Sequence, residues 1–297
     1  MRIIVIGASG LVGSHVLAEA KRRGCETLGT YRNFPVEGLA RLDLEDEGRA
    51  RVLLEDFHPD WVVHAAGWTW VDGCEKDPKR AFKENCHQPE MLARICQEIG
   101  CRFVYFSTTY VFDGKAGPYS EDAIPNPINV YAQSKWAAEQ KIQATLGGQA
   151  LIPRVICVWG REAQKKNFVY QAIKALQGGR VMTLPSDQIG NPTWAGDIAW
   201  WLLSLIESNE HGVWNLAGDQ EHCTRVDWFC QIRDAARAAG FAPAQTDAGY
   251  VAVDTTSLKQ VALRPLHAGA RLKKLRGALD REPVLPSALQ YLQEVRR

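Results

Sequence analysis

The sequence of 297 residues lacks a long hydrophobic run, and no part of it approaches 18 consecutive apolar residues. A helix needs about that length to cross a membrane. The first residues lead directly into a short apolar run, without the basic segment, apolar segment and cleavage site of a secretion signal. We therefore expect a cytoplasmic protein that has no membrane partner.

Neither sign of charge is in excess, because 35 Lys and Arg face 34 Asp and Glu, for a net charge of +1. Lys273, Lys274 and Arg276 form a small basic cluster, and such a cluster is typical of a solvated helix face. We therefore expect no nucleic-acid partner. The eight cysteines include no Cys-x-x-Cys pair and no His/Cys spacing typical of zinc, so free thiols and no metal site are expected.

Strands and helices alternate through the first half of the chain. Apolar runs predict strands at 3–6, 27–29, 61–64, 102–106 and 150–155, and helical patterns lie at 11–23, 47–56, 78–99 and 129–144. This alternation predicts a Rossmann-type α/β fold with a doubly wound parallel sheet. In the second half, helices are expected at 168–177, 194–206, 226–239 and 287–295, and a strand at 212–216.

The expected division follows from this change of pattern. Residues 1–158 would form a dinucleotide-binding domain, and residues 159–297 mainly a smaller C-terminal substrate-binding lobe. A segment near 190–216 is expected to return to the first sheet, so that no clean cut separates the two parts.

A glycine-rich turn, Gly7-Ala8-Ser9-Gly10-Leu11-Val12-Gly13, connects the first strand to the first helix. Small residues allow the backbone to turn tightly and to approach a pyrophosphate, and free amides at the helix N-terminus face the anion. An ordinary strand–helix turn is the alternative. The position directly after an apolar strand favours dinucleotide binding.

The second strand ends without the carboxylate that would bind the ribose 2′-hydroxyl of NAD. The sequence there reads Thr30-Tyr31-Arg32, and Arg32 could pair with the 2′-phosphate of NADP(H). The alternative is that Arg32 is a solvated loop residue. Asp43 and Leu44 follow after the next short segment and are expected to flank the adenine.

Tyr131 and Lys135 form a Tyr-x-x-x-Lys pair on one face of an expected helix. A nearby ammonium favours the phenolate, so the pair predicts a lowered pKa for Tyr131. Ser107-Thr108-Thr109 lies at the end of the fourth strand, where ligands bind in open α/β sheets. An exposed helix pair and local capping of the backbone by the hydroxyls are the alternatives.

Together these residues resemble the extended short-chain dehydrogenase/reductases and, within them, the dTDP-4-dehydrorhamnose reductase family. The resemblance extends along nearly the whole chain. Besides the glycine turn, it rests on Ala65–Asp72, Glu75, Asn85, Ser107–Gly114, Asn129–Lys135, Asn167-Phe168, Asp187–Thr193 and Arg264-Pro265. The Tyr-Val-Phe-Asp-Gly and Asp-Gln-x-Gly-x-Pro-Thr stretches are the most specific of these.

The resemblance implies reduction of a nucleotide-linked 4-keto sugar by NADPH, with dTDP-4-dehydrorhamnose giving dTDP-L-rhamnose as the leading case. Thr108, Tyr131 and Lys135 would be the catalytic triad. The implied cofactor contacts are Gly7, Ser9, Gly10, Leu11, Val12, Gly13, Arg32, Asp43, Leu44, Ala65, Ala66, Gly67, Asn85, Tyr131 and Lys135. The implied substrate contacts are Trp68, Asn167, Phe168, Gln188 and Asn191.

Three positions depart from the family pattern. Thr109 replaces an Asp, Cys157 occupies the place of a sugar-contacting Trp, and His15 stands where some members have a metal-binding Glu. Two other functions stay open: a nucleotide-sugar epimerase or dehydratase, and a non-catalytic NADP-binding regulatory subunit similar to the β subunit of methionine adenosyltransferase. A homodimer is also left open.

Overall fold

The computed structural model describes residues 1–241 and 249–279. Its centre is a sheet with the strand order β12-β7-β5-β4-β1-β2-β3, and β6 pairs with β7. The strands are β1 (Arg2–Ile6), β2 (Glu26–Tyr31), β3 (Ala40–Arg41), β4 (Trp61–His64), β5 (Arg102–Tyr105), β6 (Ser107–Thr108), β7 (Leu151–Val155) and β12 (Gly212–Asn215). All of these pairings are parallel. The predicted Rossmann-type α/β fold is confirmed.

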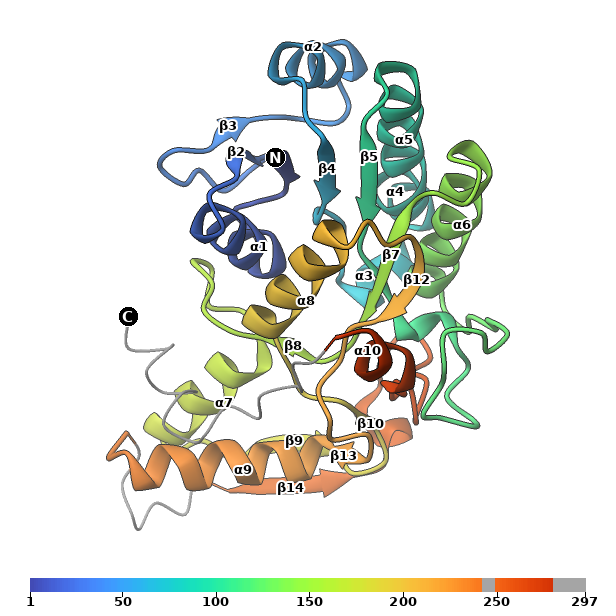
Figure 1. Ribbon diagram of the computed structural model, residues 1–297. Coiled ribbons are helices and arrows are strands. Elements are labelled where there is room, and N and C mark those ends of the chain that lie inside the picture. The colour runs from blue at the N-terminus through green and yellow to red at the C-terminus, as the bar shows by residue number, and fades with distance from the viewer. Residues whose placement is uncertain (242–248, 280–297) are drawn as a thin grey trace.

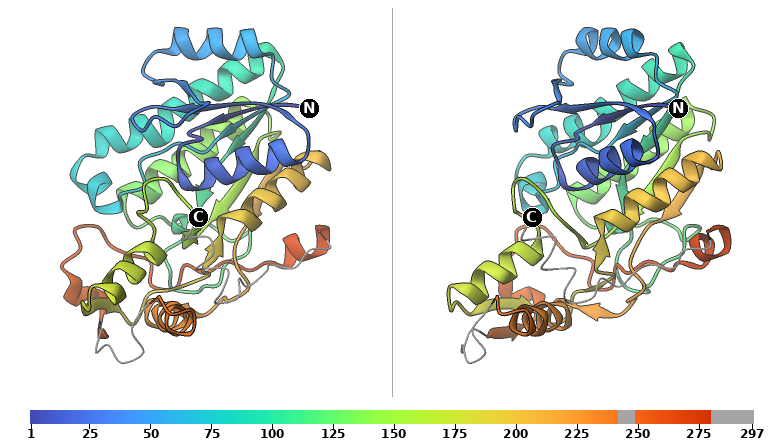
Figure 2. Two further views of the ribbon diagram at one scale, coloured as in Figure 1. Left: turned by 90° about the vertical axis from the view of Figure 1, so that its left-hand side faces the viewer. Right: turned by 60° about the vertical axis from the view of Figure 1, so that its left-hand side comes forward.

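Helices cover both faces of the sheet (Figures 1 and 2). Alternating residues of β1 point to opposite faces. Ile3 and Val5 pack in one core with α1 (Leu11–Arg22) and α8 (Ala195–Glu207). Ile4 and Ile6 pack in another core with α2 (Glu47–Phe57), α5 (Gln88–Ile99) and α6 (Val130–Thr145). The carboxyl ends of the strands are left for ligands, as in other open α/β sheets.

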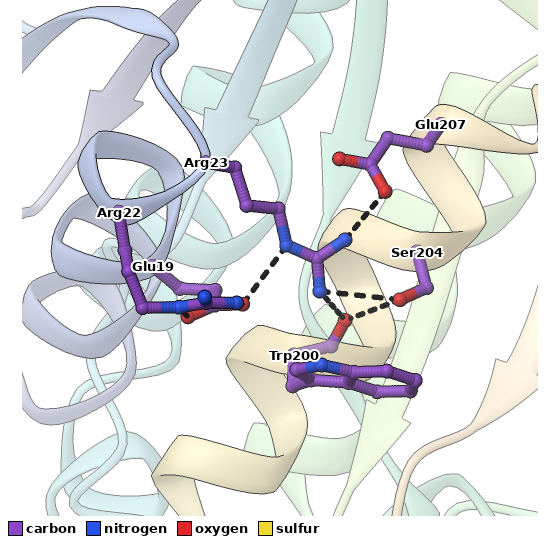
Figure 3. A network of polar contacts seen from close by, with 6 residues as sticks. All are labelled: Glu19, Arg22, Arg23, Trp200, Ser204 and Glu207. Atoms are coloured by element: carbon purple, nitrogen blue, oxygen red, sulfur yellow. Dashed lines mark hydrogen bonds and ion pairs between the residues drawn. The ribbon is translucent and has the colours of Figure 1, made fainter. Parts of the chain in front are cut away.

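One arginine joins α1 to α8 (Figure 3). The Arg23 guanidinium pairs with Glu19 at 2.9 Å and with Glu207 at 2.6 Å. It also donates to the Trp200 carbonyl at 2.9 Å and to the Ser204 hydroxyl at 3.2 Å. A helix from the second half of the chain is thereby fixed to the helix that follows the glycine turn.

A smaller lobe lies beyond the carboxyl ends of the strands (Figure 1). Its helices α7 (Phe168–Gln177) and α9 (Arg225–Ala238) enclose a core that includes Trp159 and Trp228. Short strand pairs complete it: β9 (Met182–Pro185) with β14 (Tyr250–Val253), β10 (Ile189–Gly190) with β13 (Cys223–Thr224), and β8 (Val158–Trp159) with β11 (Thr193–Trp194). Helix α10 (Lys273–Ala278) packs beside β12.

The expected strand of the second half does return to the sheet, because β12 pairs with β7. The helix expected at 78–99 is confirmed in its bounds, because α4 (Pro78–Phe82), a π-helical turn (Lys83–His87) and α5 follow one another without a break up to Gly100. The short helix α3 (Val71–Lys76) was not predicted. The helix expected at 287–295 lies outside the described residues, and the division at residue 158 stays a prediction. No helix among residues 1–241 and 249–279 has the length and apolar character that a membrane span requires.

Candidate active site

The glycine turn connects β1 to α1 in a conformation that requires glycine. Gly7 has a φ of +83°, and a Cβ on Gly13 would lie 2.4 Å from the Gly7 carbonyl oxygen. Gly10 is the N-cap of α1, and no side chain in the described part of the chain caps this end. The first amides of α1 are therefore available to an anion, which fits a dinucleotide pyrophosphate.

The end of β2 approaches this turn, since the Thr30 hydroxyl accepts a hydrogen bond from the Gly7 amide at 3.3 Å. Arg32 follows, but its guanidinium contacts the Glu84 carboxylate at 3.1 Å. The Arg32 side chain is 33% exposed in the loop after β2, so its contact with the 2′-phosphate stays a prediction. Asp43 is exposed, whereas Leu44 is buried in the core beneath it, so Leu44 offers little surface to an adenine.

Thr108 and Tyr131 come together at the end of β6. Tyr131 is buried in the first turn of α6, with the Thr108 side chain near its phenol. Burial raises the pKa of Tyr131 well above its usual range, and the nearby Thr108 side chain only partly offsets this. The expected lowering of the Tyr131 pKa by Lys135 is wrong for this structure, and the phenol is fully protonated at neutral pH.

Lys135 lies one turn further along α6 and is 5% exposed. Its ammonium donates to the Phe106 carbonyl at 2.6 Å and lies 4.2 Å from the centre of the Tyr105 ring. Burial lowers the pKa of Lys135 to about 7, although the nearby Glu139 carboxylate acts in the opposite direction. A small change in surroundings can therefore switch the charge of this amine near neutral pH.

The π-helical turn places Asn85 beside this amine. The Asn85 side chain accepts from the Trp68 amide at 2.8 Å and donates to the Trp68 carbonyl at 3.1 Å and to Ser134 at 3.2 Å. A Cβ on Gly67 would lie 3.1 Å from the Asn85 amide oxygen and 3.9 Å from the Lys135 ammonium. Asn85 thus holds the strand-end loop Ala65-Ala66-Gly67 close to the active-site lysine.

A buried ion pair supports the site and escaped sequence reasoning. Arg154 on β7 pairs with Glu139 on α6 at 2.7 Å, and both side chains are 2% exposed. The Ser107 hydroxyl also donates to Glu139. Glu139 lies one turn after Lys135 on the same helix, but its pairing with Arg154 arises only from the packing of α6 against β7, which no local pattern signals.

Of the predicted substrate residues, Gln188 and Phe168 lie at one narrow pocket in the lobe, whereas Asn191 does not. Gln188 lines a narrow pocket together with Tyr110, Cys157, Arg225 and Trp228. The centre of the Phe168 ring lies 4.8 Å from that of the Trp228 ring beside this pocket. Asn167 is the N-cap of α7, and its side-chain amide donates to the Gly160 carbonyl at 2.8 Å.

Asn191 is a correction to the predicted substrate contacts. It is fully buried, and its side chain bonds to Gly218 at 2.7 Å and to both backbone groups of Ala270, at 3.2 and 2.8 Å. These bonds occupy the amide, so Asn191 stabilises the lobe and does not reach the pocket.

Thr109 and His15 are the other two departures from the family pattern, and the structure describes the surroundings of both. Thr109 is buried, and its hydroxyl has no partner among the described residues. The His15 ring contacts the Arg161 carbonyl at 3.1 Å. In the described ranges, no three His, Cys, Asp or Glu side chains gather in a way that could hold a metal ion.

Comparison with known proteins adds to this geometry. The chain is 32% identical over 216 residues to dTDP-4-dehydrorhamnose reductase of Mycobacterium tuberculosis, covering 71% of this chain and 67% of that protein. It is 31% identical over 242 residues to methionine adenosyltransferase 2 subunit beta of Danio rerio, covering 79% of this chain and 72% of that protein.

The fold has close counterparts among solved structures. The dTDP-4-dehydrorhamnose reductase of Bacillus anthracis in complex with NADP superimposes with a TM-score of 0.82 at 25% identity, covering 98% of this chain and 97% of that one. A family model described as the RmlD substrate binding domain matches residues 1–292. This chain therefore belongs to the RmlD substrate binding domain family.

Proposed function

We propose that this chain is an NADP(H)-dependent oxidoreductase that reduces the 4-keto group of a nucleotide-linked sugar. The observation that carries the proposal is the meeting of Thr108, Tyr131 and Lys135 at the edge of the sheet where α1 presents its uncapped amides. The similarity to dTDP-4-dehydrorhamnose reductases supports this choice of reaction.

The cofactor contacts follow from the same edge. Gly10, Leu11 and Val12 would cover the pyrophosphate, with the amides of Leu11 and Val12 as donors because the Gly10 amide bonds to the Gly7 carbonyl at 3.0 Å. Ala65, Ala66 and Gly67 would line the bound dinucleotide. The available amides of α1 and the glycine-dependent approach of Gly7 to Ala66 fit this group. NADPH, when bound, supplies the hydride that reduces the keto carbon.

Each catalytic side chain has one task. The Thr108 hydroxyl holds the keto oxygen, and the Tyr131 phenol donates its proton to that oxygen as the carbonyl double bond becomes a single bond. The raised pKa of Tyr131 keeps this proton in place until the oxygen becomes basic. The Lys135 amine would reach the nicotinamide ribose, and the phenolate that remains on Tyr131 afterwards takes a proton from solvent.

The sugar nucleotide would lie against the narrow pocket lined by Tyr110, Cys157, Gln188 and Trp228. Phe168 adjoins this pocket through its contact with Trp228. Cys157 cannot stack on a sugar ring as a tryptophan can, and the nearby Trp228 ring is only 1% exposed. We take dTDP-4-dehydro-β-L-rhamnose as the leading substrate.

A panel of nucleotide-linked 4-keto sugars tests this function. Purified protein and NADPH are incubated with each sugar while the absorbance of the reduced nicotinamide is followed, with Tyr131→Phe as the matched control. Oxidation of NADPH by a thymidine-linked sugar, absent in the control, is the expected result. Tight NADPH binding without turnover of any sugar would exclude the reductase.

That second outcome would favour a regulatory, non-catalytic role. The similarity to methionine adenosyltransferase 2 subunit beta, over 79% of this chain, is the observation behind this second candidate.

We also propose that the protein is cytoplasmic, binds no nucleic acid and forms a homodimer. Analytical sedimentation would check the homodimer. The balanced charge of 35 basic and 34 acidic residues supports the absence of nucleic acid.

A further inference from the structure

A single carboxylate joins two arginines near the end of β2. Glu84, in the π-helical turn, contacts Arg32 at 3.1 Å through one oxygen and Arg80 of α4 at 2.7 Å through the other. The Glu84 side chain is 10% exposed. The three side chains together carry one net positive charge, so they form a cationic group that is held in place by a largely buried anion.

The orientation of Arg80 is fixed from two sides. Its Nε donates to Glu84, and its guanidinium carbon lies 4.2 Å from the centre of the Trp68 ring. Arg32 uses Nη2 for Glu84. A guanidinium has five N–H donors, so each arginine keeps donors for a further acceptor after these contacts.

Both arginines line one depression of about 530 Å³, together with Asn33, Asp43, Lys79 and Glu84. Among the other acids on this surface, Asp43 accepts a hydrogen bond from the Glu45 amide at 3.1 Å. Glu45 pairs with Lys83 at 2.7 Å, and the Asp77 side chain caps α4 by accepting from the Arg80 amide at 3.0 Å. The depression is therefore open, polar and bordered by the two guanidiniums.

We propose that Arg80, together with Arg32, binds the 2′-phosphate of NADP(H), and that Glu84 positions both guanidiniums for it. A phosphate monoester carries close to two negative charges and three acceptor oxygens at neutral pH, which suits two forked donors that share one carboxylate. The inference rests on the proposed use of NADP(H). It adds a specificity-determining residue, Arg80 of α4, that lies far from the end of β2 in the sequence but close to it in the structure.

Calorimetry of the unliganded protein with NADPH and with NADH tests this inference without any sugar. Arg80→Gln should weaken NADPH binding by about 10- to 100-fold, the range for losing a charge-assisted hydrogen bond. NADH binding should change less than about twofold, since NADH lacks the 2′-phosphate. Adenosine 2′,5′-bisphosphate and 5′-AMP should repeat the same contrast.

The matched control is Arg94→Gln on α5, because Arg94 also faces a carboxylate, Glu47, at 3.6 Å. It should leave both nucleotides unaffected. Equal weakening of NADPH and NADH by Arg80→Gln, or unchanged NADPH binding, would overturn the role of Arg80 while the proposed function stands. Wild-type protein that binds neither nucleotide would overturn the proposed function itself.

Discussion

The buried amine of Lys135 makes the free energy of unfolding depend on pH in a predictable way. In the folded protein its pKa is about 7, compared with an ordinary value of 10.5 for the unfolded chain. Below about pH 7 both states hold the proton, and the folded state carries the full cost of a buried ammonium. Between the two pKa values the unfolded state binds one more proton, so the free energy of unfolding rises with pH.

The expected size of this rise follows from the shift. The slope approaches about 1.4 kcal/mol per pH unit above the folded pKa. From about pH 6 to about pH 8.5 the contribution of Lys135 therefore grows by about 2 kcal/mol. Lys135→Met keeps an unbranched aliphatic chain at the same place and removes only the titrating group.

Urea unfolding of the wild-type protein and of Lys135→Met at both pH values measures the effect. Every other titrating group is present in both proteins, so the difference between their free energies of unfolding isolates Lys135. We expect this difference to shift in favour of the wild type by about 2 kcal/mol at the higher pH. A constant difference would refute the reasoning and would mean that the Phe106 carbonyl and the Tyr105 ring keep the amine charged throughout.

Three further predictions use other parts of the molecule. Tyr131→Phe should lower turnover by about 10²- to 10⁴-fold in steady-state assays, while calorimetry gives an NADPH affinity close to that of the wild type. Arg23→Met should lower the free energy of unfolding by about 1–3 kcal/mol, because it removes the contacts between α1 and α8. Its exposed neighbour, in Arg22→Met, should change stability by less than about 0.5 kcal/mol in the same urea experiment. Arg154→Met leaves Glu139 buried without its partner and should cost about 3–5 kcal/mol in urea unfolding, and adding Glu139→Leu should recover most of that loss.

The sequence was a good guide wherever the signal is local. The glycine turn, the strand before it and the Tyr131/Lys135 spacing each fall within a few residues, and their placement at one edge of the sheet follows from parallel topology. The pKa of Tyr131 could not be predicted in this way. It depends on how completely α3, α4 and the Tyr110 ring bury Tyr131, which is a property of the tertiary structure.

The residues around Asn85 illustrate the second limit. Pro78 and Gly100 bound a helical segment as the sequence predicts, but the π-helical turn at Lys83–His87 within it has no signature in the sequence. Arg80 and Glu84 have the i,i+4 spacing of an ion pair on a helix. Arg32 joins them from the end of β2 only through the tertiary structure.

The position of β12 in the sheet affects how the chain can fold while it is being synthesised. This strand spans Gly212–Asn215 and borders β7, which ends at residue 155. A nascent chain that has emerged from the ribosome only as far as the glycine turn, the triad and β7 still presents the edge of β7 unpaired, and such an edge invites pairing with other chains. The nucleotide-binding half therefore has to wait until the chain has been synthesised through Asn215 before its own sheet is complete, so the two halves should fold as one cooperative unit and not in sequence.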